Sequence, residues 1–324
     1  MPAKNEERTL PSCIRSILSQ DYNKELIEVI VIDDYSTDNT AVVAKRCGAI
    51  LITPDLSQGQ TTRAHNKNLA VQFCRGDYVI FLDAHIILPS EDWLRRVATY
   101  IKSSNLDFAS FLSTPSPELT PLLNILSLEK VKKMILPLVG VKGYSAHFFG
   151  GSMVISKDVF NKLGGFPEIP VSEDIALYKK AIKYGVNYKF IPELYVYHLD
   201  AKLQSLKHWI KRNLKEGFYS YAYGWKYSCP DKWETLFSML LGLLILGVPF
   251  TFILGFPLIL LLCFIPSLWT YRAFSAMRKS DSKIPIIHAL GLILIGSVQA
   301  FLIRMSAFGG IVFHFLLKMT GKIE

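Results

Sequence analysis

The chain has 324 residues, 50% of them apolar, and carries a formal net charge of +9. A positive net charge favours binding to nucleic acid or to an anionic membrane surface. The chain has no nucleic-acid-binding motif, and its apolar residues concentrate after residue 225. We therefore expect a membrane partner and no nucleic acid. The five cysteines lack CxxC spacing, which excludes a disulfide-stapled fold and a cysteine zinc site.

Residues 26 to 113 alternate between short apolar strands and amphipathic helices. Strands are predicted at 26–32, 49–53, 77–82 and 107–113, and helices at 38–47, 61–74 and 91–103. Such alternation is typical of a parallel sheet that is covered by helices on both faces. The predicted fold class is therefore α/β, with a Rossmann-like, mostly parallel sheet.

Acidic residues stand at the ends of two predicted strands. Asp33 and Asp34 follow the strand at 26–32, and Asp83 follows the strand at 77–82. In open α/β sheets, ligands bind beyond the carboxyl ends of the strands. We therefore expect these acids to line a ligand site.

The last third of the chain is predicted to be a membrane anchor. No charged residue occurs between Thr235 and Tyr271, and one helix of that length would be about 55 Å long, against a hydrocarbon core of roughly 30 Å. Two spans fit that stretch better than one. The expected spans are 235–250, 252–271 and 284–303, and whether 305–317 forms a fourth is left open.

The connector at 272–283 carries four Lys and Arg residues against one Asp. The positive-inside rule places such a connector in the cytosol, and two preceding spans place the N-terminal domain there too. We therefore expect a multi-pass protein of the cell membrane, with a cytosolic domain at 1–225 and an anchor at 226–324. The alternative is a soluble protein with a buried helical core.

Five short motifs occur in order along the first half of the chain. They are Pro2–Glu7 (PAKNEE), Val31–Thr40 (VIDDYSTDNT), Phe81–His85 (FLDAH), Gly164–Glu168 (GGFPE) and Ser172–Asp174 (SED). Together they resemble glycosyltransferase family 2, whose members have the GT-A fold, and the resemblance covers about residues 1–225. It implies an enzyme that uses a nucleotide-sugar donor.

The resemblance also implies where the donor binds. In the family, the P-A-x-N-E loop and the aspartate pair grip the base and ribose, while the metal loop and a later glycine lie near the sugar. The corresponding residues are Pro2, Ala3, Glu6, Asp33, Asp34, Asp83, Ala84 and Gly151. The alternatives are a solvated turn that caps the next helix for the aspartate pair and a plain turn for the glycine.

A divalent cation is implied as well, because family members hold Mn²⁺ or Mg²⁺ at a D-x-D motif that neutralises the leaving diphosphate. Here the motif is Asp83-Ala84-His85, which is also similar to the D-x-H motif of polypeptide N-acetylgalactosaminyltransferases. An imidazole ligand favours Mn²⁺ over Mg²⁺. His198, after a late strand, is the expected third ligand; a purely structural role for either histidine is the alternative.

The general base of inverting family members is the aspartate of an E-D pair at a helix start. Asp174 matches this aspartate, with Glu173 as its neighbour, and a base at this position takes the proton of the acceptor hydroxyl. Acidic side chains in a first helical turn also interact favourably with the helix dipole, and Ser172 is a good N-cap residue. The catalytic and the capping roles are compatible.

Family members usually begin with an apolar strand before the P-A-x-N-E motif, whereas only Met1 precedes Pro2 here. We expect this first strand to be missing, which would leave backbone groups of the neighbouring strand unpaired.

The sequence thus predicts an inverting hexosyltransferase that moves a sugar from a UDP- or GDP-sugar to a membrane lipid-linked acceptor. A polyprenyl phosphate, a lipid-linked oligosaccharide and a glycolipid are all left open as acceptors. The alternative is a membrane-bound nucleotide-sugar-binding protein without transfer activity, which the atypical metal motif and the missing strand would favour.

Overall fold

The computed structural model describes residues 1–55, 61–115, 151–199 and 306–320, with short pieces between 210 and 222. The chain separates into two compact units, one made of Met1–Leu128 and Ser145–Ala201, the other of Glu129–Tyr144 and Lys202–Glu324. The three predicted membrane spans and their basic connector lie outside the described residues. They stay predictions, as does the domain boundary at residue 225.

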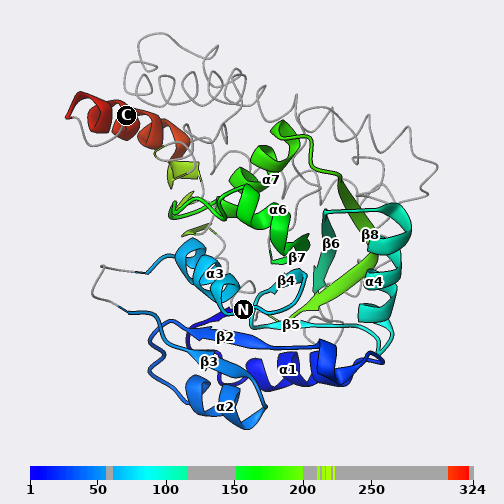
Figure 1. Cartoon of the computed structure of the whole chain (residues 1–324). Coiled ribbons are helices and arrows are strands. Elements are labelled where there is room, and N and C mark those ends of the chain that lie inside the picture. Colours follow the sequence, from blue (N-terminus) through cyan, green and yellow to red (C-terminus); the bar gives the residue numbers. More distant parts are fainter. Residues whose placement is uncertain are drawn as a thin grey trace, which may run out of the picture. The chain divides into compact units, whose positions relative to one another are not determined.

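A three-stranded parallel sheet with the order β1-β2-β3 opens the first unit (Figure 1). Its strands are β1 (Pro2–Ala3), β2 (Ile30–Asp33) and β3 (Ile50–Ile52). Helix α1 (Leu10–Leu18) lies between β1 and β2 in the chain, and α2 (Thr40–Arg46) lies between β2 and β3. All of β2 is buried, and its β-branched residues suit a strand enclosed on both faces. The parallel pairing predicted from the strand–helix alternation is confirmed in this sheet.

The first residues of the chain lie along β2. Ile32 N donates to Met1 O at 2.9 Å, and Asp34 N donates to Ala3 O at 2.8 Å. The backbone N–H groups of Ile32 and Asp34 therefore have partners in the first residues of the chain. The expectation that a strand is missing before Pro2 stays a prediction.

A five-stranded sheet with the order β4-β7-β6-β8-β5 forms the larger part of the first unit. The strands are β4 (Tyr78–Leu82), β5 (Ile86–Ile87), β6 (Phe108–Pro115), β7 (Ser152–Ser156) and β8 (Tyr188–His198). β6 and β8 pair in parallel, whereas β4–β7, β6–β7 and β5–β8 are antiparallel. This sheet is therefore mixed rather than mostly parallel. The directions of its strands could not be predicted from the sequence, because hydrophobic periodicity indicates where a strand lies but not the direction in which it enters a sheet.

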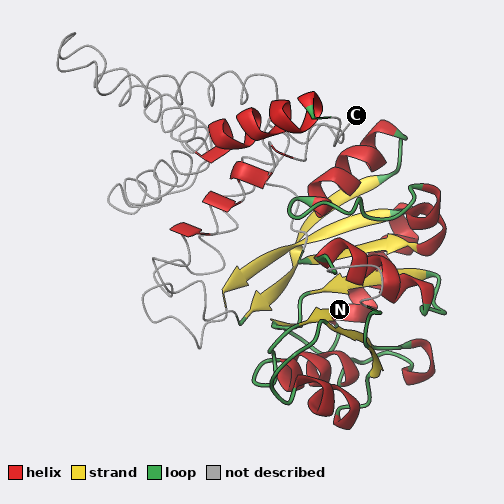
Figure 2. Ribbon diagram, turned by 90° about the vertical axis from the view of Figure 1, so that its left-hand side faces the viewer, coloured by secondary structure: helices red, strands yellow, loops and turns green. Residues whose placement is uncertain are grey.

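Helices cover both faces of the larger sheet, as predicted, and Figure 2 shows the yellow strands with red helices around them. Alternate residues of a strand point to opposite faces. Leu82 of β4 packs in a core cluster with α1 and α4 (Trp93–Ser104). Phe81 packs in a second cluster with α3 (Arg63–Gln72), α6 (Lys157–Lys162) and α7 (Glu173–Lys183).

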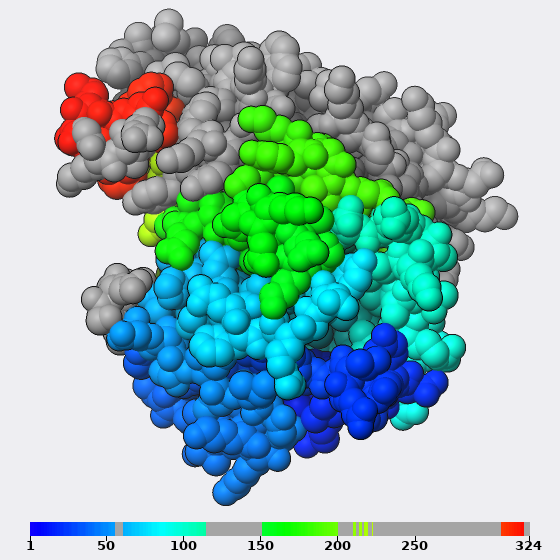
Figure 3. Space-filling model, viewed as in Figure 1, coloured from blue at the N-terminus to red at the C-terminus, as the bar shows by residue number. Residues whose placement is uncertain are grey.

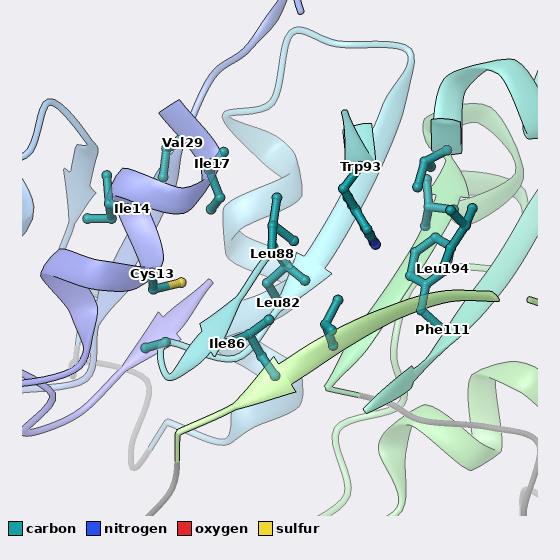
Figure 4. Packing of buried hydrophobic residues seen from close by; sticks show 14 of the residues in the cluster. Cys13, Ile14, Ile17, Val29, Leu82, Ile86, Leu88, Trp93, Phe111 and Leu194 are labelled. Carbon is teal, nitrogen blue, oxygen red and sulfur yellow. The ribbon is translucent and has the colours of Figure 1, made fainter. Parts of the chain in front are cut away.

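The first core cluster includes Trp93, the largest of its fully buried side chains (Figure 4). Trp93 is 1% exposed, and its ring centroid lies 4.9 Å from that of Phe111. Its indole N–H donates to the backbone oxygen of Tyr195 at 3.0 Å, so this buried donor has a partner. The cluster ties α4 to β6 and to β8, the strand that ends at His198.

In the second unit the structure describes a helix at 306–319 and pieces of chain near residue 220. Ile311 is buried, and His314 Nδ1 lies 3.0 Å from Ala222 O. Four large apolar side chains of this helix are exposed: Val312, Phe315, Leu316 and Met319. The helix coincides with the stretch 305–317 that was left open as a fourth span. Within the described residues, no helix combines the length and the apolarity that crossing a bilayer requires.

Candidate active site

The ends of β1 and β2 bring the first two predicted binding motifs together. Ala3 of β1 lies opposite Asp33, the last residue of β2. Asp33 is buried, whereas Asp34 is partly exposed. Asp34 Oδ2 lies 3.4 Å from Lys4 Nζ, and its other oxygen accepts a hydrogen bond from the Thr61 hydroxyl. Asp33, Asp34 and the loop that follows Ala3 thus form one wall at the carboxyl ends of the strands, next to the start of α3. We call it the nucleoside wall.

Asn5 joins the two loops of this wall. Its backbone N donates to Ser36 Oγ at 2.9 Å, and its side-chain Oδ1 accepts from Thr37 N at 2.8 Å. Asn5 has a φ of 56°, a left-handed conformation that asparagine tolerates better than most residues. The asparagine of the P-A-x-N-E motif therefore has a structural role here, which the sequence did not predict.

Asp83, His85 and His198 meet where β5 pairs with the end of β8. One candidate ligand atom from each residue lies within 4.8 Å of the others. The two imidazole centroids are 4.4 Å apart, because the antiparallel register sets Ile86 opposite His198. One carboxylate and two imidazoles are a donor set that fits Mn²⁺. The structure brings all three predicted metal ligands together.

Glu6 lies behind His85. Its Oε1 is 3.2 Å from His85 Nδ1, and both side chains are mostly buried. When Nδ1–H donates to a carboxylate, the ring is held in one tautomer and orientation, and Nε2 is left to bind a metal. Glu6, predicted to contact the nucleotide, is thus placed to orient a metal ligand.

Gly151 lies against the carboxylate of Asp83. Asp83 N donates to Gly151 O at 3.1 Å, and a β-carbon at position 151 would lie only 2.7 Å from Asp83 Oδ2. A side chain would therefore displace the carboxylate. Ala3 and Ala84 are 3% and 2% exposed and pack in the first core cluster. Their methyl groups are thus part of the core that underlies the site.

Two basic residues that the sequence did not single out govern the charge of the site. Arg63 and Lys67 lie one turn apart on α3. Burial by itself would raise the pKa of Asp83, but Arg63, Lys67 and the two histidines lower it overall. Asp83 in turn raises the pKa of Arg63 against the effect of burial, with help from Glu173 and Asp174. The only signal in the sequence is a basic pair four residues apart on the helix predicted at 61–74.

Glu173 and Asp174 open α7, as predicted. Glu173 is 4% exposed, and its Oε1 lies 3.0 Å from Lys67 Nζ. Burial raises the pKa of Asp174 to about 6, and the charge of Glu173 adds to this rise while Lys67 opposes it. A carboxylate with such a pKa is a stronger base than an ordinary aspartate and is still ionised at neutral pH.

Ser172 occupies the N-cap position of α7 without capping it. Its φ is 63°, and its side chain makes no capping hydrogen bond to the helix. Instead, Asp174 Oδ1 accepts from Ile175 N at 2.7 Å. The predicted N-cap role of Ser172 is therefore wrong. Ser172 forms the turn before the two acids in a left-handed backbone conformation that serine seldom adopts.

The chain is similar in sequence and in fold to known glycosyltransferases. A family profile described as glycosyl transferase family 2 matches residues 1–164. The chain is 31% identical over 100 residues to the 4,4'-diaponeurosporenoate glycosyltransferase of Staphylococcus haemolyticus, an alignment that covers 30% of this chain and 26% of that protein. It is 28% identical over 104 residues to the dolichyl N-acetyl-alpha-D-glucosaminyl phosphate 3-beta-D-2,3-diacetamido-2,3-dideoxy-beta-D-glucuronosyltransferase of Methanococcus voltae, which covers 31% of this chain and 32% of that protein.

The matched part thus spans about a quarter to a third of the length of these curated relatives. Among solved structures, the mannosyltransferase PcManGT from Pyrobaculum calidifontis, in complex with GDP-Man and Mn²⁺, has a similar fold. The TM-score is 0.50 at 15% identity, over 99% of this chain and 86% of that one. Because the family profile covers half of the sequence, the chain belongs to glycosyl transferase family 2.

Proposed function

We propose that this protein is an inverting glycosyltransferase that transfers a hexosyl group from a UDP- or GDP-sugar to a hydroxyl of a lipid-linked acceptor. One observation carries the proposal: helix α3 lies near both the candidate metal ligands around Asp83 and the basic carboxylate of Asp174. The charges of Arg63 and Lys67 act on both groups.

The donor side of the reaction uses the nucleoside wall and the three-ligand cluster. The ends of β1 and β2 would hold the base and ribose of the donor, since they offer buried and partly exposed carboxylates at the carboxyl edge of the sheet. Asp83, His85 and His198 would hold Mn²⁺, with Mg²⁺ less suited to two imidazole ligands. A bound divalent cation would neutralise the negative charge that grows on the leaving diphosphate.

On the acceptor side, Asp174 acts as the general base. It accepts the proton of the acceptor hydroxyl while that oxygen bonds to the anomeric carbon and the bond from this carbon to the diphosphate breaks. The nucleoside diphosphate leaves, and the configuration at the anomeric carbon inverts. A phosphate acceptor is already ionised and needs no base, so the raised pKa of Asp174 favours a hydroxyl acceptor, such as a lipid-linked oligosaccharide or a glycolipid.

Four features support an acceptor at a membrane. The tail sequence contains uncharged stretches long enough for spans, and the net charge of +9 favours anionic lipid. The helix at 306–319 exposes a stripe of large apolar side chains at helical spacing. The Methanococcus voltae relative is named for a dolichyl phosphate-linked substrate. We place the catalytic domain on the cytosolic face because of the basic connector at 272–283.

A donor panel tests the proposal. The full chain in detergent or vesicles is incubated with UDP- and GDP-sugars and a membrane lipid extract, and release of nucleoside diphosphate and labelling of lipid are measured with Mn²⁺, with Mg²⁺ and with EDTA. We expect one donor to be turned over with Mn²⁺, and Asp174→Asn to abolish transfer while donor affinity persists. Clear nucleotide-sugar binding without turnover of any donor would favour the binding-protein alternative.

Membrane association is tested separately, by flotation of the full chain with vesicles of neutral or anionic lipid. We expect flotation with both, stronger with anionic lipid at low salt. A chain that stays at the bottom of the gradient with both kinds of vesicle would contradict the membrane assignment without touching the donor chemistry.

A further inference from the structure

Helix α3 contacts the segment that leads into the base Asp174. In Figure 3 the light-blue surface near residue 70 adjoins the green surface of residues 151–199. Asn68 Nδ2 donates to Phe166 O at 2.8 Å, and Phe166 N donates to Asn68 Oδ1 at 2.8 Å. One amide side chain thus satisfies both backbone groups of a residue almost a hundred positions away. Such a two-point contact fixes both the position and the orientation of that peptide.

Gly165 permits this close approach. A β-carbon at position 165 would lie 2.7 Å from Asn68 Oδ1, and the residue has a φ of +72°. Glycine adopts that conformation without strain, whereas other residues do not. The segment before α7 is therefore shaped to receive the side chain of Asn68.

Lys67 makes the second contact of α3 with this segment. Its Nζ lies 3.0 Å from Glu173 Oε1, and the two side chains are only 3% and 6% exposed. The same ammonium lies 4.9 Å from the centroid of the Phe166 ring. A buried ion pair of this kind is strongly sensitive to the loss of one partner, because the other charge is left uncompensated.

We propose that Lys67 and Asn68 are positioning residues of the transfer reaction: Asn68 fixes the loop that carries the base, and Lys67 neutralises Glu173 so that Asp174 is the carboxylate that takes the proton. This inference rests on the proposed function, in which Asp174 is the base. Neither residue needs to touch the donor or the acceptor.

The charges around Asp174 explain why Lys67 matters. Glu173 on the same helix raises the pKa of Asp174, whereas Lys67 and Arg63 on α3 lower it. With Lys67 neutral, the adjacent carboxylates Glu173 and Asp174 would lose the ammonium that is paired with Glu173, and of the two cations on α3 only Arg63 would still act on them. Such a pair takes up a shared proton at higher pH. While that proton rests on Asp174, this carboxyl group cannot accept the proton of the acceptor.

The same helix offers a matched control. His65 Nδ1 lies 3.0 Å from Glu168 Oε1, so it joins α3 to the same segment, but the two side chains are 28% and 55% exposed. Exposed pairs contribute little to stability or positioning. His65→Gln therefore tests whether any contact between α3 and this segment has the same effect.

The experiment measures kcat and the donor KM against pH for the wild type and each variant in the membrane-bound full chain. We expect Lys67→Met to shift the acid limb of kcat upward by about one pH unit, and Lys67→Arg to leave the limb near its wild-type position. Asn68→Ala should lower kcat roughly 10- to 100-fold without moving the limb. His65→Gln should behave like the wild type, and the donor KM should change little in every variant.

A double variant keeps the test valid if Lys67→Met alone unfolds. Lys67→Met combined with Glu173→Gln removes both buried charges, so no unpaired charge is left. We expect its acid limb to lie at or below the wild-type position, opposite to the shift in the single variant, because the repulsion from Glu173 is also gone.

The outcomes separate the inference from the proposed function. A wild type without transfer activity would refute the function. An active wild type, inactive as Asp174→Asn, in which Lys67→Met leaves the limb in place or raises only the donor KM, would refute the positioning role alone. An unaltered kcat in Asn68→Ala would do the same for Asn68.

Discussion

Replacing Gly151 with alanine puts a methyl group against the candidate metal site. The new β-carbon would lie 2.7 Å from Asp83 Oδ2, and the oxygen must retreat by roughly 0.7 Å to reach ordinary van der Waals contact. Metal–ligand distances tolerate deviations of only about 0.2 Å. The hydrogen bond from Asp83 N to Gly151 O holds the two main chains together, so the carboxylate itself must rotate away from the new methyl group. We therefore expect Gly151→Ala to weaken Mn²⁺ binding by about 10- to 100-fold, or roughly 1.4 to 2.7 kcal/mol.

The assay is titration of the purified full chain with Mn²⁺, followed by calorimetry or by the EPR signal of free Mn²⁺, with and without nucleoside diphosphate. Gly76→Ala is a matched control, because its β-carbon would meet its nearest neighbour, Tyr78 O, at an ordinary 3.6 Å. Thermal unfolding checks that both variants fold. If Gly151→Ala binds Mn²⁺ as tightly as Gly76→Ala does, Asp83 is not held as a metal ligand in the way the structure indicates.

Three further predictions follow from single side chains. Because the pKa of Asp174 is raised to about 6 and a base must be ionised to accept a proton, kcat should be full well above pH 6 and fall about tenfold for each unit below it; a flat profile between pH 5 and 7 would contradict the assignment. His198→Ala removes one of three metal ligands and should raise the Kd for Mn²⁺ by about 10- to 100-fold in the same titration, and an unchanged Kd would remove His198 from the site. Trp93→Ala should lower the free energy of unfolding in urea by about 3 to 5 kcal/mol, since it leaves a cavity in the first core cluster and removes the hydrogen bond to Tyr195 O; a loss below about 1 kcal/mol would show that the cluster does not hold β8 in place.

Much of the fold was accessible from local patterns. The strand predicted at 77–82 corresponds to β4, and the helix predicted at 91–103 corresponds to α4. Helix α1 was not predicted. Its proline, Pro11, is compatible with a helix, because it lies in the first turn, where it breaks no helical hydrogen bond. The predicted strand at 26–32 begins too early, since residues 24–26 form a 3₁₀ turn and β2 starts at Ile30.

The candidate metal site was only partly predictable. The Asp83-Ala84-His85 motif is local, so the sequence could nominate two ligands. His198 was nominated as a histidine after a late strand, but nothing local to it sets its distance from His85. That distance results from the antiparallel pairing of β5 with β8, which joins residues more than a hundred positions apart.

Hydrophobic period and motif spacing are properties of neighbouring residues, so the alternation of strands and helices, the acids at the strand ends and the pair Glu173-Asp174 could be predicted without coordinates. Which distant groups act on those acids depends on the folded chain. Lys67 reaches Glu173 across 106 positions. The pKa of Asp174 depends on burial and on charges nearby in space, and neither quantity exists until the chain has folded.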